Sequence, residues 1–218
     1  MTSLPARRAA FTLIEMLVVM VVIAILASIV LSVAGLVQNK AARARAEAEI
    51  KALSGGCDAY KADHGSFPQD TTTDALDPRT TGTPTSYEEA SLFLYKQLSG
   101  DLDANGRNDT AASTPEPKSY ISDFFKPNIL SVKSSSGVGT AGYVRFLKDP
   151  WGNTYGYSTK GAAAEQKFRA AVLANPAATR EKDQGYNPTF DVWSTGGKAT
   201  PPSPGVAGDV TSVWLKNW

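Results

Sequence analysis

The sequence predicts an α+β fold in which one long N-terminal helix, half transmembrane and half amphipathic, packs against a small C-terminal antiparallel sheet. Residues 16–37 carry no charge, and these 22 residues match the about 20 that a helix needs to cross a membrane. Residues 39–61 lack proline and are rich in Ala, Arg, Glu and Lys, which favour helix. After residue 149, short aromatic and β-branched runs alternate with Pro, Gly and Asn, as strands and turns do.

Composition narrows the class of protein. The chain has 218 residues, which suits one modest globular domain with an extension. Its formal net charge of +1 offers no electrostatic basis for binding nucleic acid. Cys57 is the single cysteine, so an intrachain disulfide and a cysteine-based zinc site are both excluded, and we expect a buried small apolar residue.

The apolar run allows three interpretations. Arg7 and Arg8 precede it, which favours a cytoplasmic N-terminus. Small residues at 32–34, followed by Gly35, are compatible with a cleaved secretory signal, but the apolar region is longer than the about 7–15 residues of such signals. A plain signal anchor gains nothing from Glu15 at the edge of the span, because a carboxylate there is costly.

Ala10-Phe11-Thr12-Leu13-Ile14-Glu15 resembles the processing site of type IV prepilins. The resemblance implies that a leader peptide, residues 1–10, is cut off between Ala10 and Phe11 and that the new terminus is N-methylated. Glu15 is then the fifth residue of the mature chain. One departure is Ala10, because that family usually has Gly before the cut.

The resemblance also implies a role for Glu15 in assembly. In a filament the apolar helices bundle together, and a buried carboxylate needs a partner. We expect the amine of Phe11 on a neighbouring subunit to be that partner and to set the axial register.

The helix is expected to continue past the membrane and to span residues 11–65, with the transmembrane part at about 16–37. Gly55-Gly56 predicts a continuation or a kink, and Gly65 and Pro68 predict the end. His64, the single histidine, is expected to be a surface or capping residue. An apolar stripe of helical period supports this extent: Ala41, Ala44, Ala48, Ile50 and Leu53.

Residues 66–148 read as an insert of helix and loop. Residues 69–85 are rich in Thr, Asp, Pro and Gly, and residues 131–142 in Ser and Gly, so both are predicted loops. A helix is predicted over residues 87–98, with Ser86 and Glu89 forming a capping box at its start.

A loop in this insert has the spacing of calcium ligands. Oxygen-bearing side chains occupy its first, third, fifth and ninth positions, with Gly106 at the sixth: Asp101, Asp103, Asn105 and Asp109. The segment resembles the first half of an EF-hand or dockerin loop, although Ala112 stands where an EF-hand has Glu. A polar turn that binds no ion remains the alternative.

Residues 149–218 are expected to form the sheet. Asp149-Pro150-Trp151-Gly152-Asn153 resembles a turn of the major pseudopilin of type II secretion systems, and residues 190–194 and 210–214 resemble its later strands. A helix-like insert near 162–174 is additional. That family holds calcium with acidic residues between its last strands, whereas here Lys198 replaces one of them and Asp209 remains.

These features predict a structural pseudopilin without catalytic residues, which assembles through its N-terminal helix into a type II secretion-like filament for protein export. Its expected partners are its own copies, other pilin-like subunits, the prepilin peptidase and an inner-membrane assembly platform, with calcium as a candidate cofactor. A single pass through the inner membrane would leave the C-terminal domain in the periplasm. Two alternatives remain: a type IV pilus pilin, and a membrane-anchored extracytoplasmic enzyme or binding domain.

Overall fold

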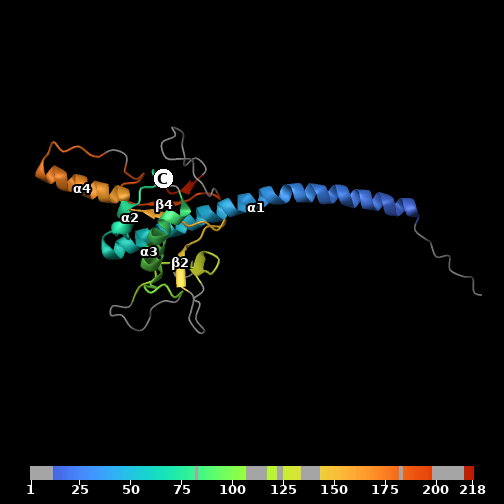
Figure 1. Ribbon diagram of the computed structural model, residues 1–218, viewed down its shortest axis with the longest axis horizontal. Helices are drawn as coiled ribbons and strands as arrows, with labels where there is room; N and C mark the ends of the chain where they lie inside the picture. Colours follow the sequence, from blue (N-terminus) through green and yellow to red (C-terminus); the bar gives the residue numbers. More distant parts are fainter. Residues whose placement is uncertain are drawn as a thin grey trace, which may run out of the picture. The chain divides into compact units, whose positions relative to one another are not determined.

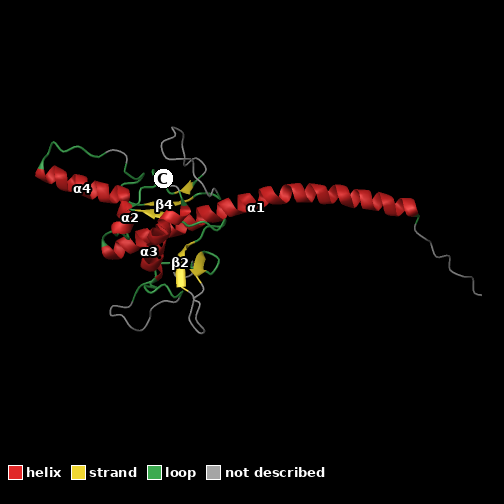
Figure 2. Ribbon diagram, in the orientation of Figure 1, coloured by secondary structure: helices red, strands yellow, loops and turns green. Residues whose placement is uncertain are grey.

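The computed structural model describes residues 12–81, 83–106, 117–121, 125–133, 143–181, 184–197 and 214–218, with side chains omitted at 31–34. The chain divides into two units, residues 1–41 and residues 42–218. Figure 1 follows the chain by colour, and Figure 2 marks its helices and strands.

Helix α1 (Leu13–His64) is 52 residues long. It continues through Gly55 and Gly56 without interruption. The helix ends where Gly65 adopts φ +78°, a left-handed conformation that glycine reaches without strain. The Gly65 N–H donates to the carbonyl of Lys61 at 2.8 Å and so satisfies one of the last carbonyls of the helix.

In the described part of the second unit, α1 is followed by three further α-helices and one short 3₁₀ helix: α2 (Thr71–Ala75), η1 (Pro84–Tyr87), α3 (Glu88–Ser99) and α4 (Lys160–Ala174). The expectation of a plain loop over residues 69–85 is therefore wrong. Asp70 and Thr73 explain α2, because each side chain accepts a hydrogen bond from the other's backbone N–H, at 2.8 and 3.0 Å.

The start of α3 also differs from the prediction. Ser86 lies inside η1 and its hydroxyl donates to the carbonyl of Thr83, so it forms no capping box with Glu89. Because the 3₁₀ helix extends to Tyr87, the N-cap position of α3 is Tyr87 and not Ser86. Glu88 in the first turn instead pairs with Arg145 of the neighbouring strand at 2.6 Å.

The described residues of the second unit also form two small antiparallel sheets. One pairs β1 (Leu130–Lys133) with β2 (Tyr143–Leu147), and the other has the order β3-β4-β5, formed by β3 (Gly156–Ser158), β4 (Asp191–Ser194) and β5 (Leu215–Lys216). Strand β1 corrects the predicted loop at residues 131–133, whereas residues 134–142 of that prediction lie outside the described residues. The α+β fold class, a long N-terminal helix followed by a small antiparallel sheet, is confirmed.

The core lies where the second part of α1, α3 and both sheets meet. Its α1 residues are spaced at helical period: Ala46, Ile50, Leu53 and Cys57. Tyr155, which directly precedes β3, and Tyr157 within β3 are both fully buried. Helix α4 contacts α2 and otherwise projects from the sheet (Figure 2).

Candidate functional site

The first turn of α1 is closed by a ring of hydrogen bonds between Thr12 and Glu15. The backbone N–H and the hydroxyl of Thr12 both donate to Oε2 of Glu15 at 2.8 Å, and the N–H of Glu15 donates to Oγ1 of Thr12 at 3.3 Å. This is a capping box, which satisfies backbone donors that no helical carbonyl can reach. Glu15 therefore has a partner within its own chain. Ala10 and Phe11, on either side of the predicted cut, lie outside the described residues.

The next part of α1 is apolar on all sides. Every side chain from Thr12 to Val30 is exposed in this structure, and large residues such as Leu13 and Met20 are exposed by 84% and 69%. Among the described residues, α1 is the one helix with a stretch long and apolar enough to cross a membrane. A helix that is apolar all round needs an apolar environment, either lipid or other helices.

A buried carboxylate attaches the second part of α1 to the sheet. Glu49 lies on the core-facing side, only 8% exposed. The hydroxyl of Tyr155, beside β3, donates to Oε2 of Glu49 at 2.6 Å, and Nε of Arg45 lies 2.7 Å from Oε1. Both oxygens of the carboxylate are thus bonded, as a buried acid requires.

A second buried carboxylate organises the turn that enters the three-stranded sheet. Oδ1 of Asp149 accepts hydrogen bonds from the N–H groups of Trp151 and Asn153 at 3.0 and 2.8 Å. Oδ2 accepts one from the hydroxyl of Ser194 on β4 at 2.6 Å. Burial raises the pKa of Asp149. The Asp-Pro-Trp-Gly-Asn segment is therefore a turn whose first residue ties it to the next strand, while Trp151 packs against the core.

Comparisons with known proteins agree with these features. Residues 5–31 match the prokaryotic N-terminal methylation motif. The chain is also 30% identical over 184 residues to the type II secretion system core protein G of Aeromonas hydrophila, covering 83% of this chain and 94% of that relative. The chain belongs to the pseudopilin family of type II secretion core protein G. No solved structure is significantly similar to it.

The family confirms the resemblance noted in the sequence and assigns the chain as a pilin-like subunit. The methylation motif and the apolar first part of α1, the one such helix among the described residues, fit a pseudopilin anchored in the membrane by one pass.

The predicted calcium loop is folded around Asp101. That carboxylate is fully buried and accepts hydrogen bonds from the Tyr95 hydroxyl at 2.6 Å and from the N–H groups of Asn105 and Gly106 at 3.0 and 2.7 Å. Asp103 is exposed and accepts hydrogen bonds from the backbone and the side chain of Asn105. Burial raises the pKa of Asp101, whereas a hydrogen bond with Asp101 lowers the pKa of Asp103.

The structure brings together three of the four proposed loop ligands, Asp101, Asp103 and Asn105. Asp109 and Asp209 lie outside the described residues. Within the described ranges, no three His, Cys, Asp or Glu side chains are grouped to hold a metal. Calcium binding by this pseudopilin stays a prediction.

Sequence reasoning missed three polar contacts that the structure reveals. The Thr12–Glu15 box had a visible signal, since Thr and Glu three residues apart at a helix start are its signature. The Asp149 turn also had one, because Asp followed by Pro and Gly favours side-chain bonds to the turn's own backbone. The bond from Tyr155 to Glu49 had none, because the two residues are 106 positions apart.

Proposed function

We propose that this pseudopilin is a structural subunit that assembles through its N-terminal helix into a type II secretion-like filament for protein export. The observation that carries the proposal is the first part of α1, where all side chains from Thr12 to Val30 are exposed and apolar residues surround the helix. Such a surface requires lipid before assembly and other helices after it. Similarity to a type II secretion core protein over 94% of its length favours secretion over a pilus.

Processing and placement follow from the same helix. A prepilin peptidase removes residues 1–10 and methylates Phe11, and Arg7 and Arg8 keep the leader on the cytoplasmic side. The pseudopilin then crosses the inner membrane once, with its C-terminal domain in the periplasm. An assembly platform in that membrane and other pilin-like subunits are its partners.

Glu15 has two successive partners in this proposal. In the single chain, the Thr12 N–H and hydroxyl bind its carboxylate. In the filament, the amine of Phe11 on a neighbouring subunit binds it and fixes the axial register, which is the best-attested role of a buried ion pair. Thr12 therefore lowers the cost of holding a carboxylate at the membrane edge before assembly.

N-terminal mass spectrometry of the membrane-derived protein tests the processing step. We expect a mature chain that begins at N-methylated Phe11. A chain that begins at Gly35 indicates an ordinary secretory signal, and one that begins at Met1 indicates an uncleaved anchor. Either result contradicts the proposal.

Substitution of Glu15 tests the assembly role. Glu15→Ala and the isosteric Glu15→Gln are both expected to reduce filament yield by at least tenfold in cells that contain the assembly machinery, because neither side chain carries the charge that pairs with an amine. Thr12→Ser, which preserves the capping hydroxyl, serves as the control and should assemble normally. Normal filament yield from Glu15→Ala would refute the role.

We also propose that the loop from Asp101 to Asp109 binds calcium weakly. Asp101 already shapes the loop, so Asp103, which is exposed, is the better residue to test. Calcium at ten times its Kd should stabilise the full chain in detergent by about 1.4 kcal/mol. Asp103→Ala should abolish the calcium-dependent rise in Tm, whereas Asp209→Ala should preserve it. The opposite pattern assigns the ion to the family's loop, and no rise in Tm in the unmodified chain contradicts calcium binding.

A further inference from the structure

The capping box between Thr12 and Glu15 fixes where α1 begins. Thr12 is not helical, and Leu13 is the first residue of α1. The backbone N–H of Thr12 donates to Oε2 of Glu15 at 2.8 Å, and so does its hydroxyl. A helix that continued past Thr12 towards the N-terminus would need that N–H for the carbonyl four residues earlier. The box therefore competes directly with any lengthening of α1.

The residues before the box favour helix. Residues 6–10 have the sequence Ala-Arg-Arg-Ala-Ala, and Ala and Arg are among the strongest helix formers. Pro5 precedes them, and proline is favoured at the first position of a helix. Where this chain has Ala10, the prepilin family usually has Gly, which is unfavourable inside a helix. The chain therefore lacks the residue that would discourage helix at the predicted cut and relies on the box at Thr12.

A helix through the cut would protect it from hydrolysis. In the proposed processing step one water is added across the Ala10–Phe11 bond. Its hydroxyl goes to the carbonyl carbon of Ala10, and its remaining hydrogen goes to the nitrogen of Phe11, which becomes the new amine. In an α-helix that carbonyl would accept from the N–H of Ile14, and the N–H of Phe11 would donate to the carbonyl of Arg7. Both hydrogen bonds would have to open first, and cleavage of a protected bond follows the population of the open form.

We propose that Thr12 is a positioning residue for leader cleavage. By holding Glu15 in the capping box, it stops α1 before the Ala10–Phe11 bond and keeps that bond available to the prepilin peptidase. The inference rests on the proposed function, because it requires a cut between these two residues. Thr12 acts through the start of the helix and takes no part in the bond changes. Its role before the cut is separate from the role of Glu15 in the filament.

Pulse-chase measurement of leader cleavage in cells that contain the peptidase tests the proposal. Thr12→Val removes the capping hydroxyl at nearly constant volume and should slow cleavage about fivefold, which corresponds to about 1 kcal/mol, the typical contribution of an N-cap. Thr12→Ser keeps a capping hydroxyl and should preserve the rate. Ser28→Ala, the control, removes a hydroxyl that donates to the carbonyl of Ile25 later in α1, and should not slow cleavage. Equal rates for Thr12→Val and the unmodified chain, or equal slowing by Ser28→Ala, would overturn the proposal.

A second substitution separates helix formation from direct recognition by the peptidase. Ala10→Gly disfavours helix at the cut. The acceleration of cleavage by Ala10→Gly should therefore be at least threefold larger in the Thr12→Val chain than in the unmodified chain. The same acceleration in both chains would mean that residue 10 acts on the peptidase alone, and would contradict the positioning role of Thr12.

The conformation before the cut can also be measured without the peptidase. In the uncleaved full chain in detergent micelles, Thr12→Val should move the Cα chemical shifts of Ala9 and Ala10 towards helical values, whereas Thr12→Ser should not. Slow cleavage of Thr12→Val with unchanged shifts would indicate a direct contact between Thr12 and the peptidase. That result would overturn the positioning role.

N-terminal mass spectrometry of the unmodified chain, from the same cells, separates the two levels of the proposal. A mature chain that begins at Phe11, together with normal cleavage of Thr12→Val, overturns the positioning role and leaves the proposed function intact. An unmodified chain that is not cut before Phe11 overturns the proposed processing itself.

Discussion

At the scale of single residues, buried acids tie the second unit together. Glu49 and Asp149 are almost fully buried, and hydrogen bonds satisfy both oxygens of each carboxylate. Such groups are costly to strip of a partner, because an uncompensated charge then remains in the interior. The effect of these carboxylates on the free energy of unfolding is therefore largest when a substitution removes one of their hydrogen-bond partners.

Removal of the Tyr155 hydroxyl tests the bond to Glu49. Tyr155→Phe should lower the free energy of unfolding by about 1.5–3 kcal/mol, the range for a hydrogen bond to a charged group. Urea unfolding of the detergent-solubilised chain, followed by tryptophan fluorescence, measures the change. Tyr143→Phe is the matched control, because Tyr143 is 42% exposed, and it should change stability by less than about 0.5 kcal/mol. Equal effects of the two substitutions would contradict a specific role for the bond.

Asp191 makes stability depend on pH. Burial raises its pKa from 3.8 to about 6, although the N–H groups of Tyr186 and Asn187 donate to its oxygens and oppose the shift. The folded chain therefore holds a proton more tightly than the unfolded chain between about pH 4 and pH 6. Across this window the contribution of Asp191 to the free energy of unfolding falls as pH rises.

Asp191→Asn should remove the contribution of this group to the pH dependence. Between pH 4 and pH 6, the fall in the free energy of unfolding should become smaller by at most about 3 kcal/mol. Urea unfolding at closely spaced pH values measures it. Asp63→Asn provides a comparison in which the pH dependence has the opposite sign. A hydrogen bond from Lys118 lowers the pKa of Asp63, so the contribution of Asp63 to stability is lost as the pH falls. An unchanged profile for Asp191→Asn would contradict the assignment.

At the scale of elements, two adjacent glycines in α1 have different surroundings. A Cβ at Gly55 would meet no atom within 4 Å, whereas a Cβ at Gly56 would lie 2.3 Å from Cδ1 of Ile121 and 2.6 Å from its Cγ1. Gly56 therefore allows the segment around Ile121 to pack closely on the helix. Gly55 has no such role and only weakens the helix.

The pair gives a matched prediction. Gly55→Ala should stabilise the chain by about 0.5–1 kcal/mol through higher helix propensity. Gly56→Ala gains the same propensity but overfills the contact with Ile121, so it should destabilise by about 1 kcal/mol net. Thermal unfolding of both variants compares them directly. Gly56→Ala as stable as Gly55→Ala would show that Ile121 moves aside freely.

At the scale of the whole molecule, the features with a local signal were predictable. The uncharged run at 16–37 predicts the apolar helix, the spacing of Ile50 and Leu53 predicts its buried side, and the alanine-rich run predicts α4. The α+β fold class followed from these signals.

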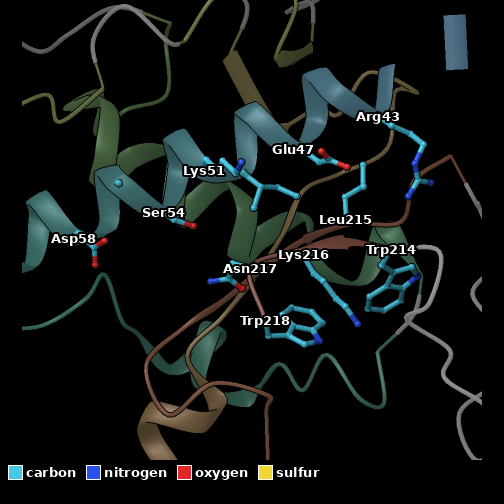
Figure 3. Close-up of a pocket in the computed structure, with 12 residues that line it drawn as sticks. Arg43, Glu47, Lys51, Ser54, Asp58, Trp214, Leu215, Lys216, Asn217 and Trp218 are labelled. Carbon is cyan, nitrogen blue, oxygen red and sulfur yellow. The ribbon is translucent and has the colours of Figure 1, made fainter. Parts of the chain in front are cut away.

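The features that depend on distant pairing were not predictable. Strands β1 and β2 are short, and Leu130 of β1 pairs with Leu147 of β2, which lies well beyond it in the sequence. The Glu49–Tyr155 bond likewise joins residues far apart in the chain. The predicted capping box at Ser86 was wrong for another reason. The Ser86 hydroxyl donates its hydrogen bond to the carbonyl of Thr83 within the 3₁₀ helix. Arg43, Glu47, Lys51 and Asp58 look like ordinary solvated residues in sequence, and only the fold shows that they line a groove beside β5 (Figure 3).

The burial of Cys57 has a practical consequence. The single thiol of the chain is fully buried, and desolvation raises its pKa, so very little reactive thiolate is present at neutral pH. In a thiol-labelling reaction, the natural sequence therefore behaves almost as if it contained no cysteine. A cysteine introduced on an exposed face, such as at Lys167, can take a maleimide dye selectively, so that individual subunits can be followed by fluorescence without first replacing Cys57.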